Sequence, residues 1–97
     1  MIYHVVAGKD WQKAEQQGFY EADSFAKEGF IHCSRAAQVY GVLDRYYKGQ
    51  HGLLLLHIDE DKLTAPLKYE NAPSINQEFP HVYGRLNLEA VVKVVEL

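Results

Sequence analysis

The chain has 97 residues, of which 47% are hydrophobic and 24% are charged. That composition is typical of one globular domain with a single core, so we predict one domain over residues 1–97. The formal net charge of −3 at pH 7 argues against a large basic surface for non-specific nucleic-acid binding. The single cysteine, Cys33, excludes an internal disulfide. No apolar run has the length of a membrane span, and the first residues lack the pattern of a signal peptide, so a cytoplasmic location is expected.

The N-terminal part of the chain predicts a strand followed by a helix. Residues 2–6 are mostly β-branched and aromatic, which indicates a short strand. Asp10 has the side chain of a helix N-cap, and the helix is expected to run through Gln17 and to end at Gly18. Ser24 is expected to cap one further short turn.

The middle of the chain predicts two more strands with a helix between them. Residues 30–33 indicate a second, buried strand. Ser34 is a favourable N-cap for a helix over residues 35–48, where apolar side chains recur at steps of three and four. Residues 53–58 form a continuous apolar run, which predicts a central strand covered on both faces.

The C-terminal part predicts two strands separated by irregular chain. Residues 67–70 alternate and indicate a strand, and residues 91–95 indicate the final one. Residues 71–78 contain a proline and several polar residues, so they are interpreted as a loop and as a candidate binding loop or lid. Residues 88–90 are expected to form one turn. Because strands outnumber helices and the helices are spread between them, the fold class is predicted to be α+β, with a small antiparallel or mixed sheet.

Three histidines stand in apolar, strand-like runs, and each has a hydroxyl-bearing residue within two positions. The histidines are His4, His32 and His81, and their neighbours are Tyr3, Ser34 and Tyr83. An apolar run ordinarily excludes a group that titrates near neutral pH, because burial of its charged form is costly. Two interpretations stay open. Each imidazole is a structural residue with its own hydrogen-bond partners, or the imidazoles converge to hold a ligand or move a proton.

The alternation of side chains along a strand separates Cys33 from its neighbours. Adjacent strand residues point to opposite faces, so His32 and Ser34 share one face and Cys33 takes the other. His32 and Cys33 are therefore poorly placed to hold one zinc ion, and no histidine or cysteine pair has the usual spacing of zinc ligands. We predict no metal site, and we interpret Cys33 as a buried core thiol rather than a nucleophile.

Two charged residues complete the candidate site. Glu70 ends a predicted strand, where a carboxylate can orient a ribose hydroxyl or act as a base; a solvated loop acid is the alternative interpretation. Arg85 lies close to Tyr83, and its planar guanidinium is the best available contact for a phosphate group. Neither a Rossmann nor a P-loop glycine fingerprint is present.

Two segments carry a resemblance to a known family. Residues 28–34 with Gln38, and residues 79–84 with Leu86 and the pair at 90–91, resemble the signature segments of the bacterial family called domain of unknown function 952. The resemblance covers essentially the whole chain. Membership implies no established activity.

The order of elements is also similar to the start of ADP-ribosyltransferase folds, which include tRNA 2′-phosphotransferases. This second resemblance implies two short mixed or antiparallel sheets with interspersed helices around a central cleft. It implies that His4 contacts the ribose of NAD and that residues 31–34 line the nicotinamide pocket. His81 or Tyr83 would take the third-strand position, where the transferases usually carry glutamate. Val5 stands where a small residue is usual.

Together these observations predict a histidine-lined cleft that binds NAD or a related nucleotide and performs an ADP-ribosyl or phosphoryl-type transfer. The alternative is a non-catalytic module that binds a ligand or a protein on the same fold. The expected catalytic residues are His4, His32 and His81, and the expected ligand-binding residues are Tyr3, Ser34, Glu70, Tyr83 and Arg85. The substrate, the reaction and the oligomeric state stay open at this point.

Overall fold

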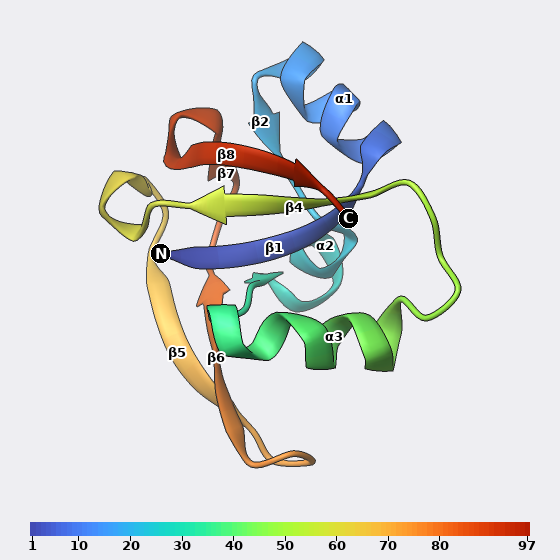
Figure 1. The fold of residues 1–97 in the computed structure, drawn as a ribbon. Coiled ribbons are helices and arrows are strands. Elements are labelled where there is room, and N and C mark those ends of the chain that lie inside the picture. Colours follow the sequence, from blue (N-terminus) through green and yellow to red (C-terminus); the bar gives the residue numbers. More distant parts are fainter.

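The computed structural model describes residues 1–97, and its largest layer is a three-stranded antiparallel sheet. Strands β1 (Ile2–Ala7), β4 (Leu53–Ile58) and β8 (Val91–Glu96) pair in the order β1-β4-β8 (Figure 1). The predicted central position of β4 is confirmed. Only one of its faces is fully covered, however, because helix α3 (Val39–Tyr46) lies below β1 in Figure 1 rather than across β4. His57, on the open face, is therefore half-buried.

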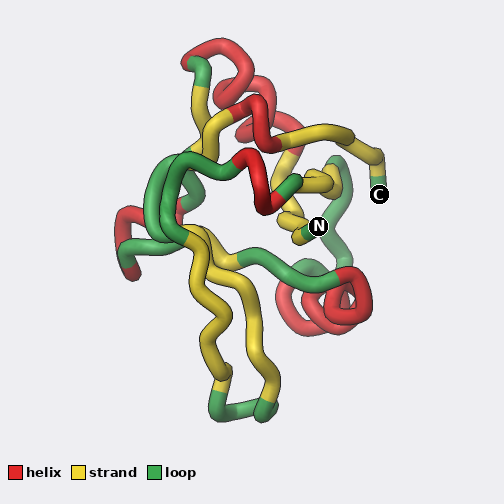
Figure 2. Tube along the Cα trace, turned by 90° about the vertical axis from the view of Figure 1, so that its left-hand side faces the viewer, coloured by secondary structure: helices red, strands yellow, loops and turns green.

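A second three-stranded sheet extends away from the first one. Strands β3 (Ile31–His32), β6 (Gln77–Val82) and β5 (Leu67–Ala72) pair antiparallel in the order β3-β6-β5. Strands β5 and β6 form a hairpin that projects from the body of the protein (Figure 2). The prediction of a loop over residues 71–78 is wrong, because only residues 73–76 form the turn. Backbone pairing holds the polar residues of this hairpin in strands, where their side chains can remain in solvent.

A third, two-stranded sheet pairs β2 (Phe19–Tyr20) with β7 (Leu86–Asn87). The structure therefore contains three antiparallel sheets instead of the two that were expected. The first two are joined at one point. The Tyr3 amide donates to the Ser34 carbonyl at 2.8 Å, and the Ser34 amide donates to the Tyr3 carbonyl at 2.7 Å.

Helices connect the sheets and differ from prediction mainly at their starts. Helix α1 (Gly8–Gln17) ends at Gly18 as predicted; Gly18 has φ 92°, a left-handed conformation that favours glycine. The helix begins before Asp10, which lies in its first turn and does not cap it. Helix α2 (Asp23–Glu28) likewise has no side-chain cap from Ser24.

Ser34 does not cap the helix that follows it, which corrects another prediction. Its backbone pairs with β1, and the chain then forms a 3₁₀ turn (Ala36–Gln38) before α3 begins. The Gln38 side-chain oxygen accepts from the Arg35 amide at 2.9 Å and satisfies the start of that turn. Two further 3₁₀ turns span Glu60–Lys62 and Leu88–Ala90, the second as predicted.

The core lies where the three sheets and α1 meet. Its twelve buried residues are Ile2, Val6, Trp11, Ala14, Tyr20, Ile31, Cys33, Leu56, Ile58, Val82, Leu86 and Ala90. Cys33 is thus a core residue, as strand alternation predicted, and burial raises the pKa of its thiol to about 12. The α+β class is confirmed. No helix has the length and apolar character needed to cross a membrane.

Candidate functional site

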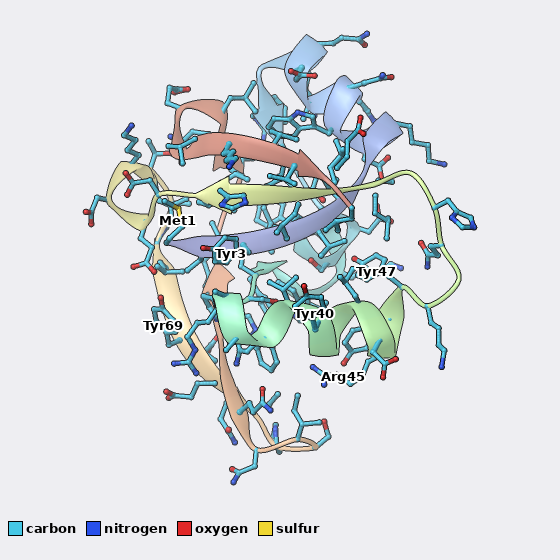
Figure 3. All side chains as sticks on the ribbon, viewed as in Figure 1. Met1, Tyr3, Tyr40, Arg45, Tyr47 and Tyr69 are labelled. Atoms are coloured by element: carbon cyan, nitrogen blue, oxygen red, sulfur yellow. The ribbon has the colours of Figure 1, made fainter.

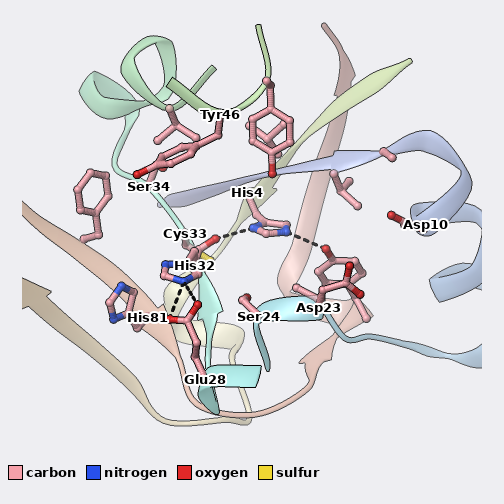
Figure 4. Close-up of a pocket in the computed structure, with 18 of the residues that line it drawn as sticks. His4, Asp10, Asp23, Ser24, Glu28, His32, Cys33, Ser34, Tyr46 and His81 are labelled. Atoms are coloured by element: carbon pink, nitrogen blue, oxygen red, sulfur yellow. Dashed lines mark hydrogen bonds and ion pairs between the residues drawn. The ribbon is translucent and has the colours of Figure 1, made fainter. Parts of the chain in front are cut away.

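A cavity of about 1030 Å³ lies between α1, α2, the end of α3 and the β5–β6 hairpin. Its volume is that of a small-molecule site. Four of the predicted site residues line it: His4, His32, Ser34 and His81. Figure 4 shows these four in the cavity together with Glu28. Sheet pairing brings the three histidines to one place although 77 positions separate the first from the last (81 − 4).

His32 and His81 are adjacent because of strand register. They are direct partners in the antiparallel β3–β6 pair, and residues opposite each other in such a pair point to the same face. Their ring centroids are 5.1 Å apart, with the rings nearly perpendicular. Both imidazoles can therefore address one reacting group of a ligand.

His81 is held by a carboxylate on the neighbouring strand. Its Nδ1 lies 2.7 Å from Glu70 Oε1, and the Tyr83 hydroxyl donates to the same oxygen at 2.5 Å. The hydrogen bond from Tyr83 and, to a smaller extent, the one from His81 lower the pKa of Glu70. The bond to Glu70 in turn raises the pKa of Tyr83. Glu70 therefore stays ionised and accepts a hydrogen bond from the Nδ1–H of His81, which leaves Nε2 as the free nitrogen.

His32 has a looser carboxylate partner. Its Nε2 lies 3.3 Å from each carboxylate oxygen of Glu28, the last residue of α2. The two side chains are 50% and 52% exposed, whereas the His81 side chain is 13% exposed. The two imidazoles thus differ: that of His81 is fixed, and that of His32 is free to change partner.

Phe30 packs against both imidazoles. Its ring stacks on His81 at 4.1 Å and meets the ring of His32 edge-on at 4.7 Å. Sequence reasoning missed Phe30 and Glu28 as site residues. Strand alternation carried a signal for Phe30, which shares a face with His32 two positions later. Glu28 precedes His32 by four positions across a turn at Gly29, and no simple period predicts that contact.

His4 plays a different part, because both of its ring nitrogens are engaged inside the protein. Nδ1 lies 2.6 Å from the carbonyl oxygen of His32, and a carbonyl only accepts, so we assign the proton to Nδ1. Nε2 then accepts from the Tyr20 hydroxyl at 2.8 Å. Burial lowers the pKa of His4 to about 4 and raises that of Tyr20. Neutral His4 therefore ties β1 to β2 and to the backbone that carries His32.

The free energy of unfolding is expected to fall as the pH drops from 6.5 towards about 4. His4 has its ordinary pKa of 6.5 in the unfolded chain and about 4 in the folded one. Within this window the unfolded chain binds a proton that the folded chain does not, so acid favours unfolding by up to about 1.4 kcal/mol per pH unit. The full contribution is present above pH 6.5.

Urea denaturation at about pH 7 and about pH 5 measures this loss. A His4→Leu variant lacks the titrating group, so its stability should change less between the two conditions. The prediction is contradicted if wild type and variant lose the same free energy on acidification.

The remaining predicted site residues lie outside the cavity walls. The Tyr3 side chain is on the outer face of the β1-β4-β8 sheet, in front of the strands in Figure 3, where its ring meets that of His57 at 4.8 Å. Arg85 forms an ion pair with Glu21 and lies over the Phe19 ring at 4.1 Å. Glu70 and Tyr83 act on the cavity through His81. No three histidine, cysteine or acidic side chains are placed to hold one metal ion.

The fold and this cavity define a small α+β protein with a paired-histidine site. The chain matches the family model described as protein of unknown function (DUF952) over residues 5–94, and it belongs to that family. This confirms the first resemblance. The likeness to ADP-ribosyltransferases stays a prediction.

Solved structures of CC0527 from Caulobacter crescentus are similar to this chain. The crystal structure is 30% identical with a TM-score of 0.90, and the match covers 99% of this chain and 84% of that one. The solution NMR structure is also 30% identical, with a TM-score of 0.85 and coverage of 99% and 83%. Comparison with curated proteins gives no match.

Proposed function

We propose that the cavity binds NAD or a related nucleotide, and that His32 and His81 move protons during an ADP-ribosyl or phosphoryl-type transfer. One observation carries the proposal: the two imidazoles face one cavity with centroids 5.1 Å apart, and each has a carboxylate partner. Such a pair can accept a proton from an attacking group and give one to a leaving group.

His81 is the better general base. Glu70 holds its Nδ1 and Phe30 holds its ring plane, so Nε2 has a fixed direction. A carboxylate that orients an imidazole in this way also stabilises the imidazolium that forms when a proton is taken. His32, half-exposed, is the better group for contacting the ligand or for returning a proton.

Both transfers balance with these two groups. An acceptor hydroxyl gives its proton to His81 Nε2 as its oxygen bonds to the ribose C1′ or to phosphorus. In ADP-ribosyl transfer the bond from C1′ to the nicotinamide nitrogen breaks, and nicotinamide leaves as a neutral molecule. In phosphoryl transfer the bond from phosphorus to the departing oxygen breaks, and His32 gives that oxygen a proton.

The ADP-ribosyltransferase-like arrangement is part of the same proposal. His4 on β1 and His32 on β3 both line the cavity, which supports this part of the proposal. The glutamate usual on the third strand is replaced by His81, and Glu70 on the adjacent strand β5 supplies a carboxylate that acts on the cavity through its contact with His81. The presence of His81 where the transferases carry glutamate supports a transferase whose acid–base group is an imidazole.

Incubation with NAD labelled in its nicotinamide ring tests the proposal. We expect saturable binding and release of nicotinamide above the protein-free rate. A His51→Gln variant provides a matched control, because His51 is an exposed histidine outside the cavity. Binding without release identifies a non-catalytic module. If neither NAD binding nor nicotinamide release is observed, the NAD proposal is contradicted.

A further inference from the structure

We infer that Glu28 occupies the place of an anionic ligand group at His32, and that a phosphate or carboxylate of the ligand displaces it. The inference rests on the proposed function, because it concerns the same imidazole pair. It adds the chemistry of the group that binds there and identifies an internal competitor for that group.

The contact between Glu28 and His32 has the geometry of a held anion. Both carboxylate oxygens lie 3.3 Å from Nε2, so the imidazole faces the carboxylate as it would face two oxygens of a bound phosphate. The carboxylate lies in the wall of the cavity rather than behind it, because Glu28 and His32 both line that space. A ligand anion reaching His32 Nε2 must take the position that Glu28 now holds.

Glu28 is the exchangeable carboxylate of the site. It is 52% exposed, and its only polar partner is His32 at a long distance. Exposed ion pairs of this kind add little net stability, so their replacement costs little. Glu70 differs in its partners, since it lies 2.7 Å from His81 and accepts from Tyr83 as well. The structure thus separates a positioning carboxylate from a replaceable one.

The charge of the cavity wall bears on the effect of removing Glu28. Lys13 is the single lysine or arginine among the lining residues, against four acids: Asp10, Glu21, Asp23 and Glu28. A wall with this balance offers an anionic ligand group little fixed positive charge. Glu28 places its own negative charge beside His32, so its removal should strengthen anion binding there.

Titration with inorganic phosphate tests the inference. The imidazole NMR signals of His32 and His81 are followed at constant pH and ionic strength. Glu28→Gln keeps the shape of the side chain and removes its charge. We expect it to tighten phosphate binding by roughly threefold to fivefold, the effect of losing one exposed charge contact.

Asp23→Asn is the matched control, because Asp23 lies on the same helix and in the same wall but does not touch His32. It should tighten binding by less than about twofold, since only a more distant charge is lost. Equal effects of the two variants, or no effect of Glu28→Gln, would overturn the inference. So would a phosphate titration that shifts neither imidazole.

A parallel titration with acetate at equal ionic strength separates the two ligand chemistries. A stronger response to phosphate assigns the position to a phosphoryl group, and an equal response assigns it to anionic oxygens in general. Neither titration contains NAD. If Glu28→Gln tightens phosphate binding and wild type releases no nicotinamide, this inference is retained and the proposed reaction is refuted. If nicotinamide is released and Glu28→Gln does not change phosphate binding, the proposed reaction is retained and this inference is refuted.

Discussion

Replacing His81 with glutamine is expected to lower the rate of nicotinamide release by about 100-fold or more, the usual contribution of a positioned general base. Glutamine retains a polar side chain at β6 but has no nitrogen that takes up a proton near neutral pH. The measurement is the rate constant for release from labelled NAD at saturating concentration. Under that condition a binding defect does not contribute to the loss.

Two variants make this result specific to proton transfer. Glu70→Gln keeps a hydrogen-bond acceptor near His81 but removes the charge that stabilises its imidazolium, so we expect release to slow in this variant as well. His51→Gln should leave the rate unchanged. A His81→Gln protein that folds normally and releases nicotinamide within twofold of wild type would exclude His81 as the base.

Replacing His4 with leucine is expected to lower the free energy of unfolding by about 3 kcal/mol. The change leaves the buried hydroxyl of Tyr20 and the part-buried carbonyl of His32 without their partner, and an unsatisfied buried group costs about 1–3 kcal/mol. The side chain of His4 is 8% exposed, so water cannot readily replace the lost bonds. Urea denaturation followed by far-ultraviolet circular dichroism gives the measurement.

A double-mutant cycle tests the cause of this loss. Tyr20→Phe removes the hydroxyl and leaves only the Nε2 atom of His4 unpaired, so it should cost less than His4→Leu. In the double variant the two costs should not add, because both substitutions remove the same bond. A His4→Leu protein within about 0.5 kcal/mol of wild type would show that His4 is not part of the stabilising network.

Local sequence signals predicted several of the elements around the cavity. The β-branched run of β1, the apolar run of β4 and the helix end at Gly18 each depend on neighbours in the chain. The separation of His32 from Cys33 follows from side-chain alternation alone. These features are local, so one sequence was enough to predict them.

Features that depend on long-range pairing could not be predicted from the sequence. The direct opposition of His32 and His81 is set by the register of β3 against β6, across 49 positions (81 − 32). The hydrogen bond between His81 and Glu70 depends on the β5–β6 hairpin. The polar composition of this hairpin led to the prediction of a loop. The structural role of His4 depends on Tyr20, whose position comes from the β2–β7 pair.

The projecting hairpin gives the two ends of the cavity different local stabilities. Strand β6 has partners on both sides only near its inner end, where Ile31 and His32 pair with it. Beyond that point it forms a two-stranded ribbon with β5, and an isolated ribbon is only marginally stable in water. Local opening therefore costs least at the hairpin turn and most at the imidazole pair. The hairpin end of the cavity wall is therefore expected to open more often than the end that carries His32 and His81.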